Sequence, residues 1–330
     1  MTNAIATPPD AWIADLLEVQ NPFQSAMLCG DGVSYEFYSR QDSKRGDRDY
    51  VMSRGELMEF ATNPRRWRNG FREDGTKETE WGQLVDGLLL CDARGPLIAV
   101  APETYPDSKT GEPKPWNWNA TYCKKWRESA EGHIIVKASV FNEATKAVEI
   151  LKADADIWNL LQCSKKQVMV QGDYKDEKTG ICVTVRGLID LAPDRTSAQF
   201  ADCLVDLKTC SFALPVVWRR HVSDFGLDQQ AALYLDLWNA ATGEKRDTFR
   251  HIIQESASPY DVSKRALTAD FIAIGRAKYL AALKRYCACL QSGDWPGYDD
   301  EETTPPNEPI IDGWRYIAPD KRAIEQAMWV

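Results

Sequence analysis

Three consecutive β-type segments in the middle of the chain constrain its fold more than any other feature. Val- and Ile-rich stretches with partial alternation span residues 167–174, 181–191 and 198–208, and Lys178-Thr179-Gly180 offers a turn between the first two. Alternating apolar runs separated by turn residues are typical of β-strands. The pattern therefore predicts three strands in sequence, joined as an antiparallel meander.

Helical patterns surround these strands. Ser53 and Glu56 have the spacing of a capping box, which predicts a helix that starts there and ends near Asn63-Pro64. Further helices are predicted over residues 82–90, 120–132, 139–161, 225–240 and 263–291, a strand over 248–254 and a loop over 103–119. This order predicts a mixed α/β fold in which helices cover both faces of a central sheet.

Charge is distributed unevenly along the 330 residues, and we expect this distribution to match the domain boundaries. Of the net charge of −9, residues 1–39 contribute five acids and no base, and residues 291–330 contribute nine acids and three bases. We predict an N-terminal extension over 1–50, one domain over 51–292 and an acidic tail over 293–330. The nearly neutral body with local basic clusters can still attract phosphates.

The remaining composition indicates a protein of a reducing compartment. The first basic residue is Arg40, so the positive start of a signal peptide is missing. No apolar run approaches the length needed to span a bilayer, and the strongest one, Leu84 to Cys91, is interrupted by Asp86. Nine cysteines without a CxxC motif predict reduced thiols in a cytoplasm. None of the three histidines has zinc-ligand spacing with a cysteine, so carboxylates are the expected ligands of any metal.

Charged residues interrupt two of the predicted strands. Asp190 ends one apolar run, and Asp206 and Lys208 lie two residues apart in the next, which puts their side chains on one face. A buried acid is costly unless it is paired or bound to metal. The two aspartates and the Leu207 carbonyl are oxygen ligands suited to Mg²⁺, and Lys208 can then position and deprotonate a water. The alternative is a structural Asp–Lys ion pair.

An ordered set of motifs resembles the PD-(D/E)XK nucleases, and within them the phage-type exonucleases of the RecE (exonuclease VIII) kind. The matching segments, which span about residues 50–300, are Gly82–Asp86 (G-x-x-x-H), Gly187–Asp190 (G-x-x-D), Val205–Thr209 (D-x-K-T), Gln230–Tyr234 (Q-x-x-x-Y), and the late segments Gln254–Tyr260 and Gly293–Tyr298. The resemblance implies a restriction-endonuclease-like αβββαβ core with helical additions.

The resemblance also implies an activity. We expect a Mg²⁺-dependent exonuclease, with Mn²⁺ as a substitute, that digests linear duplex DNA in the 5′→3′ direction. It implies a ring-shaped homo-oligomer in the cytoplasm of a bacterial host, working with a single-strand annealing protein in phage or prophage recombination. Asp190, Asp206 and Lys208 would be catalytic, and Asp86 would join the two aspartates and Leu207 around the metal.

Two positions depart from the family pattern. Asp86 stands where the motif has His; it can still bind a metal through oxygen, or it can simply face solvent. Gln171 stands where a Glu often begins the first core strand, which removes a charge near the site. Both changes put the level of activity in doubt.

Other candidate residues have two interpretations each. Gln230, a catalytic candidate, and Tyr234, a DNA-binding candidate, share a helix face and could serve the site or only pack the helix on the sheet. The predicted phosphate contacts are Arg54, Arg65, Arg66, Arg68 and Arg186. The cluster at 65–68 could equally be a solvated patch, Arg186 could pair with an acid, and Trp67 is expected in the core.

Three rival functions stay open at this point. The chain could be a catalytically silent DNA-binding or scaffold protein with a nuclease fold, which the changes at Asp86 and Gln171 favour. It could be an endonuclease with the same core. It could also be an unrelated α/β protein in which Asp206 and Lys208 form a structural pair.

Overall fold

A mixed β-sheet forms the centre of the computed structural model, which describes residues 20–33, 35–71, 77–91, 98–298, 310–311 and 314–315. In this part of the chain the sheet has seven strands, in the order β1-β7-β8-β9-β10-β11, with β2 paired to β8. Their bounds are β1 (Phe23–Gly30), β2 (Val51–Ser53), β7 (Ser164–Lys175), β8 (Cys182–Pro193), β9 (Cys203–Cys210), β10 (Thr248–Glu255) and β11 (Val262–Ala266). Strands β7, β8 and β9 form the predicted antiparallel meander, and β10 adds in parallel to β9.

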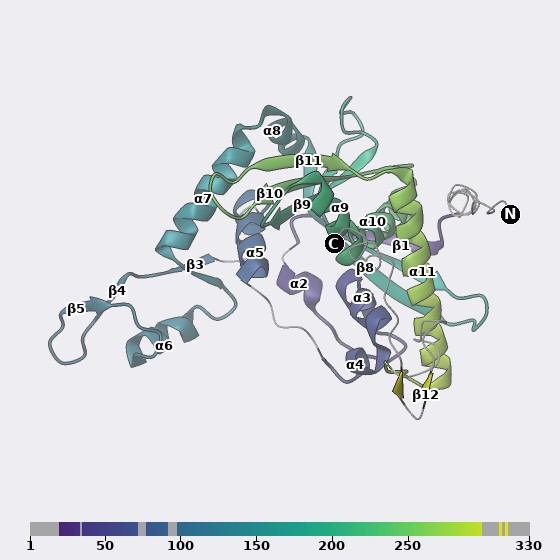
Figure 1. Ribbon diagram of the computed structural model, residues 1–330, viewed down its shortest axis with the longest axis horizontal. Coiled ribbons are helices and arrows are strands. Elements are labelled where there is room, and N and C mark those ends of the chain that lie inside the picture. Colours follow the sequence, from purple (N-terminus) through teal and green to yellow (C-terminus); the bar gives the residue numbers. More distant parts are fainter. Residues whose placement is uncertain are drawn as a thin grey trace.

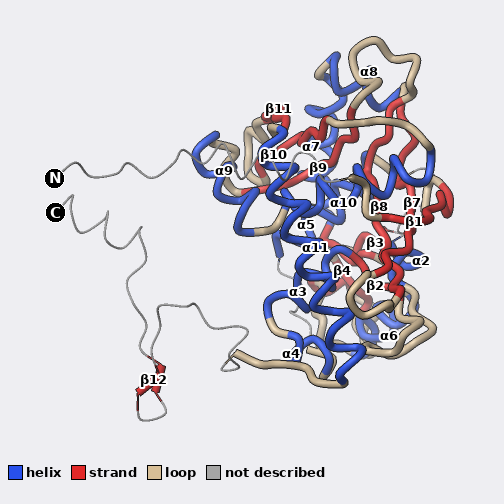
Figure 2. The backbone as a smooth tube through the Cα atoms, turned by 90° about the vertical axis from the view of Figure 1, so that its right-hand side faces the viewer, coloured by secondary structure: helices blue, strands red, loops and turns tan. Residues whose placement is uncertain are grey.

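Helices cover both faces of this sheet (Figure 1). One apolar core lies between the sheet and α3 (Arg54–Thr62), α10 (Leu227–Thr242) and α11 (Ala269–Ser292). A second lies on the other face, beneath α5 (Lys77–Leu89), α7 (Ala138–Ala153) and α8 (Ala155–Gln162). From the side, α8 and α4 (Pro64–Arg68) lie at opposite ends of the molecule (Figure 2). The predicted α/β class, with a mixed sheet flanked by helices, is confirmed.

The remaining elements are short or lie at the edges. They are α2 (Tyr35–Ser39), β3 (Ile98–Ala101), β4 (Thr104–Pro106), β5 (Pro113–Pro115), α6 (Thr121–Ser129), β6 (Ile134–Lys137), α9 (Pro215–Asp224), β12 (Ile310–Ile311) and β13 (Trp314–Arg315). The β4–β5 hairpin and α6 extend away from the sheet as an arm (Figure 1). None of the described helices is long and apolar enough to cross a membrane. All nine cysteines are free of disulfides.

Local signals explain several boundaries. The capping box predicted at the start of α3 is present, because the Ser53 hydroxyl accepts from the Glu56 backbone and the Glu56 carboxylate accepts from the Ser53 backbone at 3.0 Å. Asn63 then caps α4, accepting from the Arg66 backbone at 2.9 Å. Trp67 is in the core, as expected, with 1% of its surface exposed.

The structure differs from the sequence expectations at four places. The helix expected from residue 263 is wrong at its start: residues 262–266 are strand β11, which pairs antiparallel with β10, and the helix begins at Ala269. The third meander strand begins at Cys203 rather than 198, and the loop expected over 103–119 contains the β4–β5 hairpin. Within the predicted N-terminal extension, β1 pairs with β7, so the sheet reaches back beyond residue 50.

Candidate active site

The site begins where β8 and β9 meet. The two strands pair at Leu191 and Val205, and beside this pair the Asp190 carboxylate takes a hydrogen bond from the Leu207 backbone N–H at 2.9 Å. A side-chain oxygen thus accepts an N–H that a neighbouring strand's carbonyl would otherwise take. This contact fixes Asp190 against the strand that carries Asp206 and Lys208.

Asp206 is held from two sides. Its carboxylate forms an ion pair with Lys208 and accepts a hydrogen bond of 2.8 Å from the Gln230 side-chain amide of α10. Only 2% of the Asp206 side chain is exposed, whereas Lys208 keeps 27% of its side chain exposed. The Lys208 ammonium also lies 3.5 Å from the Leu207 carbonyl. Lys208 therefore reaches from a buried carboxylate toward solvent.

Asp86 approaches the same cluster from helix α5. This helix packs closely on β9, since a Cβ added at Gly82 would lie 3.1 Å from the Thr209 hydroxyl. Burial raises the pKa of Asp86 to about 7; the positive charge of Lys208 opposes this effect and the negative charge of Asp206 adds to it. The structure thus brings Asp86 within electrostatic reach of the two catalytic candidates on β9.

The electrostatics of the cluster are those of crowded, poorly solvated carboxylates. Burial raises the pKa of Asp190 well above its usual range, and the charges of Asp206 and Asp86 raise it further. Burial alone would lower the pKa of Lys208, but Asp206 and Asp190 outweigh it and the pKa is raised. Three acids and one lysine therefore lie close together, and their excess negative charge makes ionisation of the acids unfavourable.

Two residues of the site could not be found from the sequence. Gln167 donates its side-chain amide to Asp190 at 3.2 Å, from a backbone with φ of 48°. His251 is the register partner of Asp206 on β10, and neither of its ring nitrogens has a hydrogen-bond partner in the described structure. No local signal marks either residue, since Gln167 depends on a left-handed backbone and His251 on the pairing of distant strands.

Gln171, which the sequence predicts near the site, is distant from the acidic cluster. Gln171 pairs in register with Met27 and Arg186, four residues along β7 from Gln167. Four strand residues span about 13 Å. Gln167, rather than Gln171, is therefore the glutamine that neighbours the acidic cluster.

Gln230 and Tyr234 both face the sheet from α10. Gln230 contacts Asp206, as described, and Tyr234 lies against the backbone of β8, where a Cβ at Gly187 would be 2.6 Å from its ring. Tyr234 is 5% exposed, and burial raises the pKa of its hydroxyl. Gln230 thus belongs to the cluster, and Tyr234 supports the strand that carries Asp190.

The candidate DNA-contacting arginines fall into two groups. Arg65, Arg66 and Arg68 are exposed on α4 and hold the segment 295–298: Arg66 donates to the Tyr298 hydroxyl at 2.7 Å, and Arg68 lies over the Trp295 ring at 5.5 Å. They remain near solvent, where a phosphate could reach them, and their DNA role stays a prediction.

Arg54 and Arg186 are tied to the protein. Arg54 donates to the Gly226 carbonyl at 2.7 Å, in the turn between α9 and α10. Arg186 is 5% exposed and donates to the Arg40 carbonyl at 2.7 Å. Backbone carbonyls thus orient both side chains, and their contact with DNA also stays a prediction.

The fold and the site together define the class of PD-(D/E)XK-type domains. This class has a mixed sheet flanked by helices, an aspartate on one strand and an Asp-x-Lys on the next. The chain belongs to the family described as a PDDEXK-like domain of unknown function, which matches residues 111–303. The superfamily expected from the sequence motifs is therefore confirmed.

Comparison with solved structures supports the same fold. A crystal structure of a protein from Eubacterium rectale, described as a "putative exonuclease", matches with a TM-score of 0.50 and 15% sequence identity. The match covers 86% of this chain and 97% of that one. No curated protein matches the sequence.

Proposed function

We propose that the chain is a metal-dependent deoxyribonuclease that digests linear duplex DNA from its ends. The observation that carries the proposal is the meeting of Asp190, Asp206 and Lys208 where β8 joins β9, with Asp86 close by. Membership of a PDDEXK-like family supports hydrolysis of phosphodiester bonds. Exonuclease action, the 5′→3′ direction and a place in phage-type recombination follow from the RecE-like motifs.

The donor chemistry of the cluster fits Mg²⁺ or Mn²⁺. Carboxylate oxygens are the ligands these ions prefer, and a cation would relieve the repulsion among Asp86, Asp190 and Asp206. Asp206 also has a buried oxygen whose only partner among the described residues is the Lys208 ammonium. Among the described residues, no three side chains of Asp, Glu, His or Cys lie close enough together to hold a metal ion without some rearrangement. We propose that Asp190, Asp206 and the Leu207 carbonyl hold the metal, with Asp86 completing the set.

The protein's own groups then have distinct roles. A bound metal would polarise the scissile phosphate and activate a water. Lys208, partly open to solvent, positions that water and offsets charge that develops on the phosphate. Gln230 orients Asp206 through its amide, and Gln167 does the same for Asp190.

Digestion of end-labelled linear duplex DNA tests the proposal. We expect degradation in Mg²⁺ and Mn²⁺, loss of it in EDTA, and at least about a hundredfold slower cleavage in Lys208→Ala and Asp206→Asn. Asp270→Asn and Lys175→Ala are matched controls, because both residues are exposed and lie outside the cluster. Undiminished digestion by both site variants would refute the assignment.

The substrate form separates the finer alternatives. Labels at the 5′ and 3′ ends report polarity, and cutting of a covalently closed circle would indicate an endonuclease. Sedimentation of the full chain tests the proposed ring-shaped homo-oligomer. Co-purification with a single-strand annealing protein tests that proposed partner.

A catalytically silent DNA-binding protein is the second candidate. It is favoured by the direct Asp206–Lys208 ion pair and by the lack of a ready three-ligand group in the described chain. Tight binding of linear duplex DNA without cleavage in either metal would support it.

A further inference from the structure

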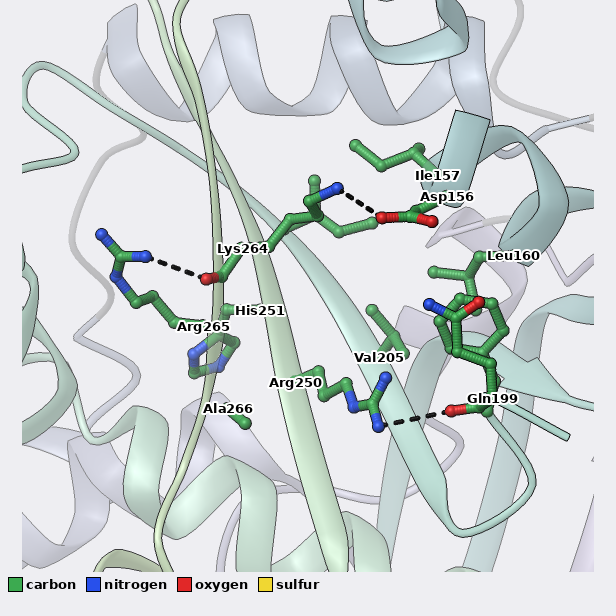
Figure 3. A pocket seen from close by; sticks show the side chains of 12 residues that line it. Asp156, Ile157, Leu160, Gln199, Val205, Arg250, His251, Lys264, Arg265 and Ala266 are labelled. Atoms are coloured by element: carbon green, nitrogen blue, oxygen red, sulfur yellow. Dashed lines mark hydrogen bonds and ion pairs between the residues drawn. The ribbon is translucent and has the colours of Figure 1, made fainter. Parts of the chain in front are cut away.

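A cavity of about 230 Å³ opens between α8 and strands β9, β10 and β11 (Figure 3). Its apolar wall consists of Ile157, Leu160, Phe200, Val205 and Ile252. The wall at Val205 lies on the face of the sheet opposite the catalytic cluster, because Val205 and Asp206 are successive strand residues and point to opposite faces. His251, the register partner of Asp206, also lines the cavity. Val205 belongs to the core beneath α5, α7 and α8, whereas Asp206 contacts Gln230 of α10.

Three cations border this cavity, Arg250, Lys264 and Arg265, and among the described residues only Lys264 is neutralised by carboxylates. Lys264 forms ion pairs of 2.9 Å with Asp154 and with Asp156, which tie β11 to α8. Arg250 has no carboxylate partner among the described residues. Its guanidinium lies 5.5 Å from the centre of the Phe200 ring and donates to the Gln199 carbonyl at 3.4 Å, near the limit of a hydrogen bond.

An arginine without a carboxylate beside an apolar wall favours a ligand with an anion at one end and a flat, weakly polar body. Arginine binds phosphate through paired, charge-assisted hydrogen bonds. The cavity is also smaller than the usual range for drug-sized ligands, about 300–1,000 Å³, which excludes an oligonucleotide. A single nucleotide has this combination of size, charge and shape.

We propose that this cavity binds a nucleoside 5′-monophosphate, with the phosphate at Arg250 and the base against the apolar wall. This choice of ligand rests on the proposed function, since a mononucleotide is what an exonuclease releases. The binding itself needs neither catalysis nor a metal.

Calorimetry of the full chain with dAMP in EDTA tests the proposal. We expect dAMP to bind the wild type, and Arg250→Ala to weaken binding by at least about tenfold. Arg127→Ala is the matched control, because Arg127 is an exposed arginine of α6 that does not line the cavity. Binding by this variant should equal that of the wild type.

Further measurements keep the outcome decisive. Leu160→Trp, which fills the cavity, should abolish binding while the chain stays folded by circular dichroism. Asp206→Asn should bind dAMP normally even though it cannot digest DNA, so failure of the nuclease proposal and failure of this one are distinguishable. Three outcomes would overturn the proposal. They are failure of the wild type to bind dAMP, equally good binding of inorganic phosphate or deoxyadenosine, and loss of binding only in Asp206→Asn.

Discussion

His251 is a buried imidazole whose environment makes its protonation costly. It is 1% exposed, its ring lies 5.5 Å from the rings of Trp218 and Phe249, and burial lowers its pKa to about 4. The unfolded chain takes up this proton near pH 6.5, but the native state does so only near pH 4. Stability is therefore full above pH 6.5 and falls as the pH drops toward 4, by about 3 kcal/mol from this residue.

Urea unfolding at pH 7.5 and pH 4.5 measures this contribution. His251→Phe should lose clearly less unfolding free energy than the wild type between the two values, while His133→Gln, at an unrelated surface turn, should behave like the wild type. Equal losses in all three proteins would show that His251 is not the acid-sensitive group.

In the proposed mechanism, Gln230 acts on the chemistry through Asp206, which accepts its side-chain amide. Removal of a hydrogen bond to a charged group costs about 1.5–3 kcal/mol. We therefore expect Gln230→Ala to lower kcat by roughly 10- to 100-fold with little change in KM, and Gln230→Glu to be worse because two carboxylates would face each other. A rise in KM with unchanged kcat would instead assign Gln230 to DNA binding.

At the level of elements, the crossing of α10 and α11 depends on one glycine. A Cβ at Gly275 would overlap the Asp228 carbonyl, so the two helices could not keep their separation. Gly275→Ala should reduce the unfolding free energy by about 1–3 kcal/mol despite the better helix propensity of alanine. Gly55→Ala in α3, where no atom lies within 4 Å of the added Cβ, should be neutral or stabilising in the same urea titration.

Elements with local signals could be predicted, and elements created by distant pairing could not. The capping box of α3, the β7–β8–β9 meander and the Asp-x-Lys pair follow from neighbouring residues. Strand β11 looks helical because Lys264 and Arg265 are compatible with either structure; it becomes a strand only because β10 offers an edge. His251 reaches the site for the same reason, through the parallel pairing of β10 with β9.

For the whole molecule, the acidic cluster predicts that metal binding and folding are coupled. Asp86, Asp190 and Asp206 repel one another in the native state, and the pKa of Asp190 and that of Asp86 are raised as a result of burial and this repulsion. A divalent ion that binds only the folded chain stabilises it by about 2.7 kcal/mol at a concentration 100 times its Kd.

Mg²⁺ and Mn²⁺ should therefore raise the Tm of the wild type by a few degrees at pH 7.5. Without metal, Asp190→Asn should have a higher Tm than the wild type, because the repulsion is reduced, whereas Asp206→Asn also loses the buried ion pair with Lys208 and should have a lower Tm. Both variants should gain little when metal is added. Calorimetric scans that show the same metal-dependent rise in the wild type and in both variants would place the ion elsewhere on the protein.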